Sequence, residues 1–290
     1  EVSATRSQAE KLEGKGHCLR STLADSRLVK TACLSRDGRF ALSAVSGSTL
    51  NLWNVATGKC VRMIDVPSIP YTEVTSVWLS TDGRHALSGS SDTTLKLWET
   101  ATGECLRTFT GHTGWINSVS MSQDGGVVLS GSTDTTIKLW QAATGNCLRT
   151  LSGHTDAVTC ACLSEEGRVA LSGSKDRTLK LWDAETGECL RTFSGHTDAV
   201  TCACLSDDGR TALSGSNDRT LRLWATTTGE CRHIAAMHTG RVISVSLSGD
   251  GRFALSGSED QTFKLWDVAL RRCIRTFEGQ QSWVRAVNLS

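Results

Sequence analysis

The stretch SGHTDAVTCACLS occupies residues 152–164, and the same thirteen letters return at residues 194–206. The first copy places His154 ahead of two cysteines, Cys160 and Cys162, that are two positions apart. Taken alone, this arrangement is compatible with half of a metal site or with the histidine of a nucleophilic pair. Its return after 42 residues indicates instead that the stretch is one unit of a repeat.

Three features of the sequence recur with a common period. A Leu-Trp pair places its tryptophan, at spacings of 45, 42, 42, 42 and 42, at Trp53, Trp98, Trp140, Trp182, Trp224 and Trp266. A cysteine recurs at Cys18, Cys60, Cys105, Cys147, Cys189, Cys231 and Cys273. A strand-like run ends in serine at Ser35, Ser80, Ser122, Ser164, Ser206, Ser248 and Ser290. Because three independent markers agree, the chain is predicted to be an array of repeats.

Within one period the sequence alternates short β-prone runs and turns. AVTCACLS and RVALSGS are separated by EEG, and RTLKLWD and GECLRTF are separated by AETG. Each period therefore predicts four antiparallel strands. A single such sheet cannot bury both of its apolar faces, so neighbouring repeats must stack against one another. Radial stacking of four-stranded sheets is a β-propeller, and the fold class is predicted to be all-β.

The segments GHTGWINSVSMS, LSGSTDTTIKLW and GECLRTF, which together follow a GH…D…LW register, closely resemble the WD40 repeat. The resemblance covers residues 16–290, and such closely matched repeats are similar to propellers of bacterial multidomain regulators. It implies a non-enzymatic interaction scaffold or sensor module, part of a larger signalling protein, that binds a protein or peptide partner on one face of the ring. This face, called the top face, carries the loops that lead into the innermost strands.

The predicted organisation is a polar lead at 1–15 followed by a propeller at 16–290. Six blades are expected at about 29–64, 74–109, 116–151, 158–193, 200–234 and 242–277. A seventh, incomplete blade would take its outer strand from residues 16–23 and its inner strand from residues 284–290. Two explanations stay open: a seven-bladed ring that is cut about 20 residues early, or six blades with a defective closure. An incomplete blade also suggests an oligomer formed through it.

Four blades combine a histidine, a serine, an aspartate and a tryptophan, which suggests catalytic triads. By resemblance to the WD40 family, they form buried structural relays instead, because an enzyme has no use for four equivalent triads around one ring. The relay residues are His112, Asp134 and Trp140; His154, Asp176 and Trp182; His196, Asp218 and Trp224; and His238, Asp260 and Trp266. Either Ser130 or Ser132 could complete the first. The repeated cysteines are interpreted as packing residues, and no metal site is expected.

Residues that break the repeat are the candidates for partner binding. At the entry to the inner strand they are Glu73, Trp115, Arg241 and Trp283, and in the turn around the relay aspartate they are Lys175, Arg177 and Arg219. Tryptophan and arginine are enriched in interface hot spots. The set predicts an acidic or phosphorylated partner segment with an apolar anchor.

Composition limits the alternatives. Lys and Arg total 31 and Asp and Glu total 30, which weakens the case for nucleic-acid binding through the Lys175/Arg177/Arg219 arc. A hydrolase-like propeller enzyme would need one asymmetric cluster of acids or metal ligands, and none is apparent. No cofactor motif is present, so no cofactor is expected. No membrane span or signal peptide is visible, and the cysteines suit a reducing compartment, so a cytoplasmic location is expected.

Overall fold

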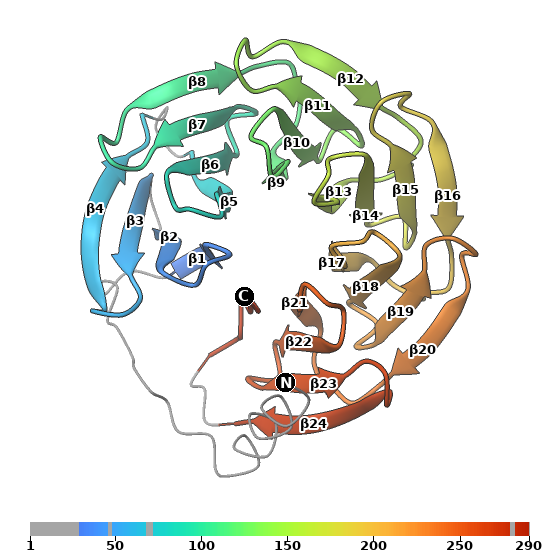
Figure 1. Ribbon diagram of the computed structural model, residues 1–290. Coiled ribbons are helices and arrows are strands. Elements are labelled where there is room, and N and C mark those ends of the chain that lie inside the picture. Colours follow the sequence, from blue (N-terminus) through green and yellow to red (C-terminus); the bar gives the residue numbers. More distant parts are fainter. Residues whose placement is uncertain (1–28, 46–47, 68–71, 279–281, 290) are drawn as a thin grey trace.

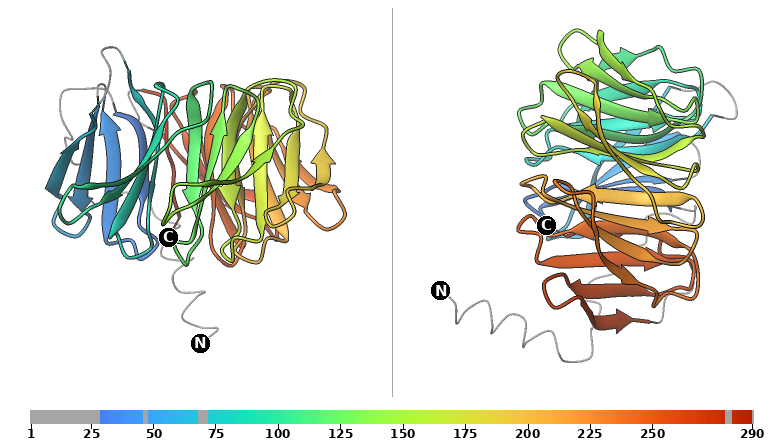
Figure 2. Two further views of the ribbon diagram at one scale, coloured as in Figure 1. Left: turned by 90° about the horizontal axis from the view of Figure 1, so that it is seen from above. Right: turned by 90° about the vertical axis from the view of Figure 1, so that its right-hand side faces the viewer.

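A computed structural model of the protein describes residues 29–45, 48–67, 72–278 and 282–289. These residues form six four-stranded antiparallel sheets that stand radially around a central axis (Figure 1). In each sheet the strands follow the chain from the innermost to the outermost. Seen from the edge, the strands run between the two faces of the ring (Figure 2). The all-β propeller predicted from the sequence is confirmed.

Each blade contains four strands. Blade 1 has β1 (Val29–Leu34), β2 (Phe40–Val45), β3 (Thr49–Asn54) and β4 (Lys59–Asp65); blade 2 has β5 (Val74–Leu79), β6 (His85–Ser90), β7 (Leu95–Glu99) and β8 (Cys105–Phe109). Blade 3 has β9 (Ile116–Met121), β10 (Val127–Ser132), β11 (Ile137–Gln141) and β12 (Cys147–Leu151); blade 4 has β13 (Val158–Leu163), β14 (Val169–Ser174), β15 (Leu179–Asp183) and β16 (Cys189–Phe193). Blade 5 has β17 (Val200–Leu205), β18 (Thr211–Ser216), β19 (Leu221–Ala225) and β20 (Cys231–Ala235); blade 6 has β21 (Val242–Leu247), β22 (Phe253–Ser258), β23 (Phe263–Asp267) and β24 (Arg272–Phe277).

The core lies between blades rather than within them. Leu87 and Leu95 of blade 2 share one buried cluster with Trp140 of blade 3, and the clusters of the following blades repeat this arrangement. In blades 2 to 5 the second strand has a glycine at the closest approach to the next blade. A Cβ on Gly173 would lie 2.6 Å from Cγ1 of Val200. Because each interface needs two neighbouring repeats, one blade cannot bury its faces alone.

The prediction of a seventh blade is wrong for the described residues, which form six sheets. Residues 284–289 do lie beside β21: the N–H groups of Val287 and Leu289 donate to the hydroxyls of Ser244 and Ser246 at 3.1 and 3.0 Å. These residues form no strand, because no neighbouring strand pairs with them in a ladder. Residues 1–15 and 16–23, assigned to the lead and the outer strand, lie outside the described residues.

Two blade limits also differ slightly from the prediction. Strand β4 ends at Asp65 and β20 ends at Ala235, each one residue beyond the expected range. In the described part of the chain, no helix has the length and apolar character needed to cross a membrane.

Candidate functional site

A line of buried polar side chains runs through blade 3. The indole N–H of Trp140 donates to the Ser130 hydroxyl at 2.8 Å, and that hydroxyl lies 2.9 Å from Nε2 of His112. Nδ1 of His112 lies 2.7 Å from Oδ2 of Asp134. Ser130 is therefore the serine of the relay, while the hydroxyl of Ser132 accepts the backbone N–H of Asp134 at 3.1 Å.

The same contacts recur in blades 4 to 6. The distances from Nδ1 of histidine to Oδ2 of aspartate are 2.7, 2.8 and 2.8 Å, and each Nε2 lies 2.7–2.8 Å from the serine hydroxyl. The residues are His154, Ser172, Asp176 and Trp182; His196, Ser214, Asp218 and Trp224; and His238, Ser256, Asp260 and Trp266. Within the described ranges, blades 1 and 2 show only the tryptophan-to-serine bond of the relay, from Trp53 to Ser43 and from Trp98 to Ser88.

The electrostatics of the relay fix where its protons lie. Burial lowers the pKa of His112, although Asp134 opposes that shift. Burial alone would raise the pKa of Asp134, but hydrogen bonds from Thr136, Thr113 and His112 hold it at about 2. A neutral imidazole beside an ionised carboxylate donates from Nδ1 to Asp134 and accepts the Ser130 hydroxyl proton at Nε2. Each polar group of the relay thus has a partner, as a buried network requires.

The relay serines are poorly placed for catalysis. The four residues Ser130, Ser172, Ser214 and Ser256 are each 0% exposed. A serine nucleophile needs space beside its hydroxyl for the carbonyl that it attacks. Each of these hydroxyls instead lies between an indole N–H and an imidazole, so the cluster suits holding a blade together.

The relay aspartate also joins two loops of the top face. Asp134 lies in the turn between β10 and β11, and its Oδ2 accepts the N–H of Thr113, in the loop before β9, at 3.0 Å. Beside it, the Thr133 N–H donates to the Trp115 carbonyl at 2.9 Å. The equivalent backbone bonds, at 3.0, 2.9 and 3.0 Å, run from Lys175 to Ala157, from Asn217 to Ala199 and from Glu259 to Arg241. In blades 3 to 6, a backbone hydrogen bond therefore joins the residue before the relay aspartate to the residue at the entry to the inner strand.

Both predicted aromatic anchors are accessible. Trp115 is 58% exposed and Trp283 is 49% exposed, and the Arg285 guanidinium lies 5.4 Å from the centre of the Trp283 ring. Gly114 precedes Trp115, and a Cβ on it would lie 2.7 Å from the backbone nitrogen of Asp134. Trp115 belongs to the loop before β9 of blade 3. Trp283 precedes Val284, whose N–H donates to the carbonyl of Ser258 in blade 6, so the two tryptophans lie at different blades of the ring.

Three of the predicted cations are free to meet a partner. Lys175, Arg177 and Arg219 are exposed, and none of them has an ion-pair partner among the described residues. Arg177 has a φ of 71° and Arg219 has a φ of 69°. This left-handed turn is held by the relay aspartate, because Oδ1 of Asp176 accepts the N–H of Thr178 at 2.9 Å. The backbone that carries the arginines is therefore fixed by the relay beneath it.

The other two predicted binding residues already have partners. Nε of Arg241 lies 3.8 Å from a carboxylate oxygen of Glu259, and the Arg241 side chain remains 60% exposed. Glu73 accepts a hydrogen bond from Lys30 at 2.8 Å, which joins blade 2 to blade 1. Arg241 thus stays accessible, whereas Glu73 forms a contact between blades rather than joining the cations.

Sequence reasoning missed a charged cluster on the opposite side of the ring. The Arg36 guanidinium lies 2.6 Å from the Glu165 carboxylate and also bonds Asp207, which joins blade 1 to blades 4 and 5. Burial raises the pKa of Asp207, and the nearby Glu165 adds to this effect while Arg36 opposes it. The sequence does mark this cluster, because the residue after the recurrent serine breaks the repeat in every blade. These residues are Arg36, Thr81, Gln123, Glu165, Asp207 and Gly249.

The cysteines form two groups. Cys160 and Cys202 are buried between blades, and burial raises the pKa of Cys160 to about 12, so its thiol stays protonated. The packing role expected for the outer-strand cysteines is wrong for Cys60, Cys105, Cys147 and Cys189, which are exposed because the outermost strand has no further sheet to cover it. Among the described residues, no three His, Cys, Asp or Glu side chains gather as metal ligands do.

Repeated four-stranded blades, stacked radially and held by Asp–His–Ser–Trp relays, define a β-propeller built from WD repeats. Residues 121–290 match the family model described as the IFT122 first beta-propeller, and residues 58–99 match the WD domain, G-beta repeat. The chain belongs to the WD40-repeat β-propeller family. A comparison with curated proteins found no match. Propellers of this family are typically scaffolds for protein–protein interaction.

Proposed function

We propose that the protein is a non-catalytic interaction module that binds an acidic or phosphorylated protein segment on its top face. One observation carries the proposal: the relay His, Ser and Trp that blades 3 to 6 share are buried, while Trp115, Lys175 and Arg241, at positions that differ between blades, are exposed on the loops beside the relays. These differing positions are therefore the ones through which a partner on the top face can recognise this chain. Membership of a larger regulatory or signalling protein, and a cytoplasmic location, remain predictions.

The cations supply the charge recognition. Lys175, Arg177 and Arg219 form no ion pair with any described residue, so a partner phosphate or carboxylate does not have to displace one there. Arginine offers a planar pair of donors that matches both anions. The fixed turn backbone at Arg177 and Arg219 reduces the ordering cost of binding.

The exposed tryptophans supply the apolar anchor. Trp115 and Trp283 present large, rigid surfaces of the kind that dominates binding energy in interfaces. Their exposure costs free energy in the isolated chain, and a partner that covers them recovers it. Nucleic acid could also meet the cations, but the nearly neutral total charge gives it no long-range attraction.

A peptide-library experiment tests the proposal. Random peptides around a fixed phosphoserine, and the same library with serine, are incubated with the purified protein, and the bound sequences are ranked. We expect phosphorylated peptides with acidic and apolar residues to be enriched. Lys175→Glu/Arg219→Glu should weaken the best peptide by about tenfold or more, because two cations are reversed.

The matched control reverses one charge on the opposite face. Arg210 is exposed and lies in the turn between β17 and β18, within the same blade as Arg219. Arg210→Glu should leave peptide binding unchanged. Equal weakening by both variants, or binding of an oligonucleotide in preference to every peptide, would overturn the proposal.

A further inference from the structure

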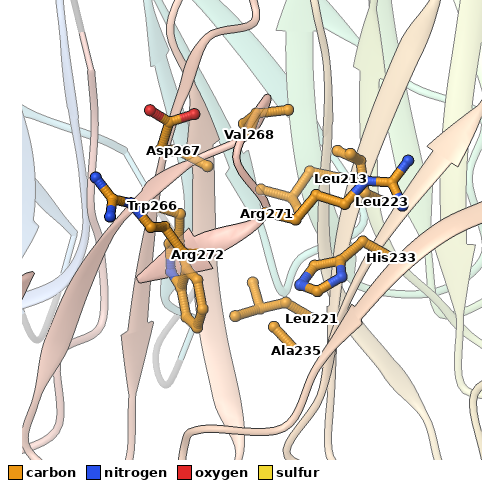
Figure 3. Close-up of a pocket in the computed structure, with 11 residues that line it drawn as sticks. Leu213, Leu221, Leu223, His233, Ala235, Trp266, Asp267, Val268, Arg271 and Arg272 are labelled. Atoms are coloured by element: carbon orange, nitrogen blue, oxygen red, sulfur yellow. The ribbon is translucent and has the colours of Figure 1, made fainter. Parts of the chain in front are cut away.

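The interface between blades 5 and 6 contains an apolar pocket. It is lined by Leu213, Leu221, Leu223, Ala235, Ala254 and Trp266, with His233, Arg271 and Arg272 among the polar residues around it. Figure 3 shows Leu221 and Ala235 near the Trp266 ring, with His233 and Arg271 beside them. Its volume is about 30 Å³. That exceeds the roughly 10–15 Å³ that one water needs, and the lining beside the Trp266 ring is apolar.

The pocket exists because one repeated side chain is missing. The last core residue of the outer strand is Ile64, Phe109, Leu151, Phe193 and Ala235 in blades 1 to 5. In two of the other interfaces this residue packs on the next blade's tryptophan, with ring centroids 5.8 Å apart for Phe109 and Trp140 and 5.5 Å apart for Phe193 and Trp224. Ala235 is too small to fill the same space beside Trp266.

A second repeated contact is missing at the same interface. In blades 1 to 4, an outer-strand arginine donates to a backbone carbonyl in the last turn of the next blade; Arg191, for example, donates to Thr227 at 2.8 Å. In blade 5 this arginine is replaced by His233, which forms no such bond in the described part of the chain. The interface between blades 5 and 6 therefore lacks both the large apolar side chain and the arginine-to-carbonyl hydrogen bond that close the equivalent sites.

The turn beside the pocket is also altered, and it becomes basic. The other blades have a glycine two residues before the outer-strand cysteine, as at Gly187 and Gly229. Blade 6 has Arg271 at this position, with a φ of 53°. Arg271 and Arg272 are exposed and have no ion-pair partner among the described residues. The nearby Asp267 carboxylate accepts the Leu270 N–H at 2.8 Å and so stabilises the turn.

We propose that this pocket is a binding site for a branched aliphatic carboxylate, either a free acid or the C-terminal leucine of a peptide. The isobutyl group occupies the space that Leu151 fills at the interface between blades 3 and 4, and the carboxylate meets the Arg271 guanidinium, which has no ion-pair partner among the described residues. An aliphatic group suits the small volume better than a ring does. The site is separate from the top-face residues on which the proposed function depends.

The experiment follows the Trp266 indole N–H by NMR, with the signal assigned from a Trp266→Phe variant. The probes are 4-methylpentanoate, its neutral amide, a short peptide that ends in leucine, and the same peptide with an amidated terminus. We expect saturable shifts, with each acid binding about two- to fivefold more tightly than its amide, as one partly exposed ion pair provides. Tighter binding of the free acid or of the peptide identifies the source of the ligand.

Two variants restore the residues of the other blades, and a third opens a matching cavity elsewhere. Ala235→Leu should abolish the shifts and raise the melting temperature by about 2–4 °C, because it fills the space. Arg271→Gly should equalise the acid and the amide while leaving amide binding intact. Leu151→Ala opens a matching cavity beside Trp182, where the turn has Gly187, and should show no preference for acids. Equal binding of acid and amide to the wild type, or unchanged binding to Ala235→Leu, would overturn the proposal.

Discussion

Nδ1 of His154 lies 2.7 Å from Oδ2 of Asp176, although 22 residues separate them in the chain. The contact joins the loop before β13 to the turn between β14 and β15. Lys175 and Arg177 flank the same aspartate and are exposed. The buried relay and the exposed cations are therefore parts of one pair of loops, so the conformation of the top face depends on the relays beneath it.

Removal of one relay histidine should lower the stability of the protein substantially. His154→Ala removes one partner each from the Ser172 hydroxyl and the Asp176 carboxylate and leaves a cavity beside them, and we expect the free energy of unfolding to fall by about 2–4 kcal/mol. The control is His85→Ala. Because His85 is exposed on β6, this change should alter the free energy of unfolding by less than about 0.5 kcal/mol. Urea unfolding measures both. Equal costs would show that the relay contributes no special stability.

Stability should depend on pH through the relays. Burial lowers the pKa of His112, His154, His196 and His238 below the ordinary value of 6.5, so these groups are neutral in the folded protein. The unfolded chain binds protons first as the pH falls below 6.5, and the stability present above that pH is lost. The relay aspartates, such as Asp134 with a pKa of about 2, add a second loss as the pH falls below 3.8.

The pH dependence is tested by urea unfolding between pH 7.5 and 5. We expect the free energy of unfolding to decrease over this range in the wild type, and to decrease less steeply in His154→Gln, which has one titrating group fewer. A free energy that stays constant or rises on acidification would contradict the assignment of neutral relay histidines.

The cluster around Arg36 should link distant blades weakly. Arg36 is 40% exposed, so Arg36→Gln should lower the free energy of unfolding by only about 0.5–1 kcal/mol. A double-mutant cycle with Asp207→Asn isolates the contribution of the pair. The coupling should shrink as the salt concentration increases. A coupling energy of zero at low salt would contradict the ion pair between blades 1 and 5.

The inter-blade glycines should not tolerate a methyl group. A Cβ on Gly173 would lie 2.7 Å from Sγ of Cys160 as well as close to Val200, so Gly173→Ala should cost about 1–3 kcal/mol of stability. Gly126→Ala is the control, because a Cβ there would meet only the flexible Asp124 carboxylate, at 3.3 Å. A similar melting temperature for the two variants would contradict the tight packing between blades.

Features that repeat could be predicted from the sequence, because each is marked several times. The tryptophan spacing predicted the sheets, and the order of His112, Asp134 and Trp140 indicated a relay. The choice between Ser130 and Ser132 could not be made, since both lie on the same face of one strand and differ only in their distance from the histidine.

Features that depend on closure of the ring could not be predicted. Whether residues 284–289 form a blade depends on pairing with other strands, which no local pattern records. The contact of Arg36 with Glu165 spans 129 residues and depends on the number of blades around the axis. Ala235 was visible as a break in the repeat, but its effect became clear only from its position beside Trp266.

The most direct test of the central claim, that partners bind the top face, is an NMR titration of the tryptophan indole N–H groups with the best phosphopeptide from the library. Trp115 and Trp283 are exposed, whereas Trp98, Trp140, Trp182 and Trp224 are at most 2% exposed. We predict that the Trp115 and Trp283 signals shift in a saturable way while these four buried signals stay in place. Saturable binding that leaves Trp115 and Trp283 unmoved, and shifts Trp78 or Trp266 instead, would contradict the claim.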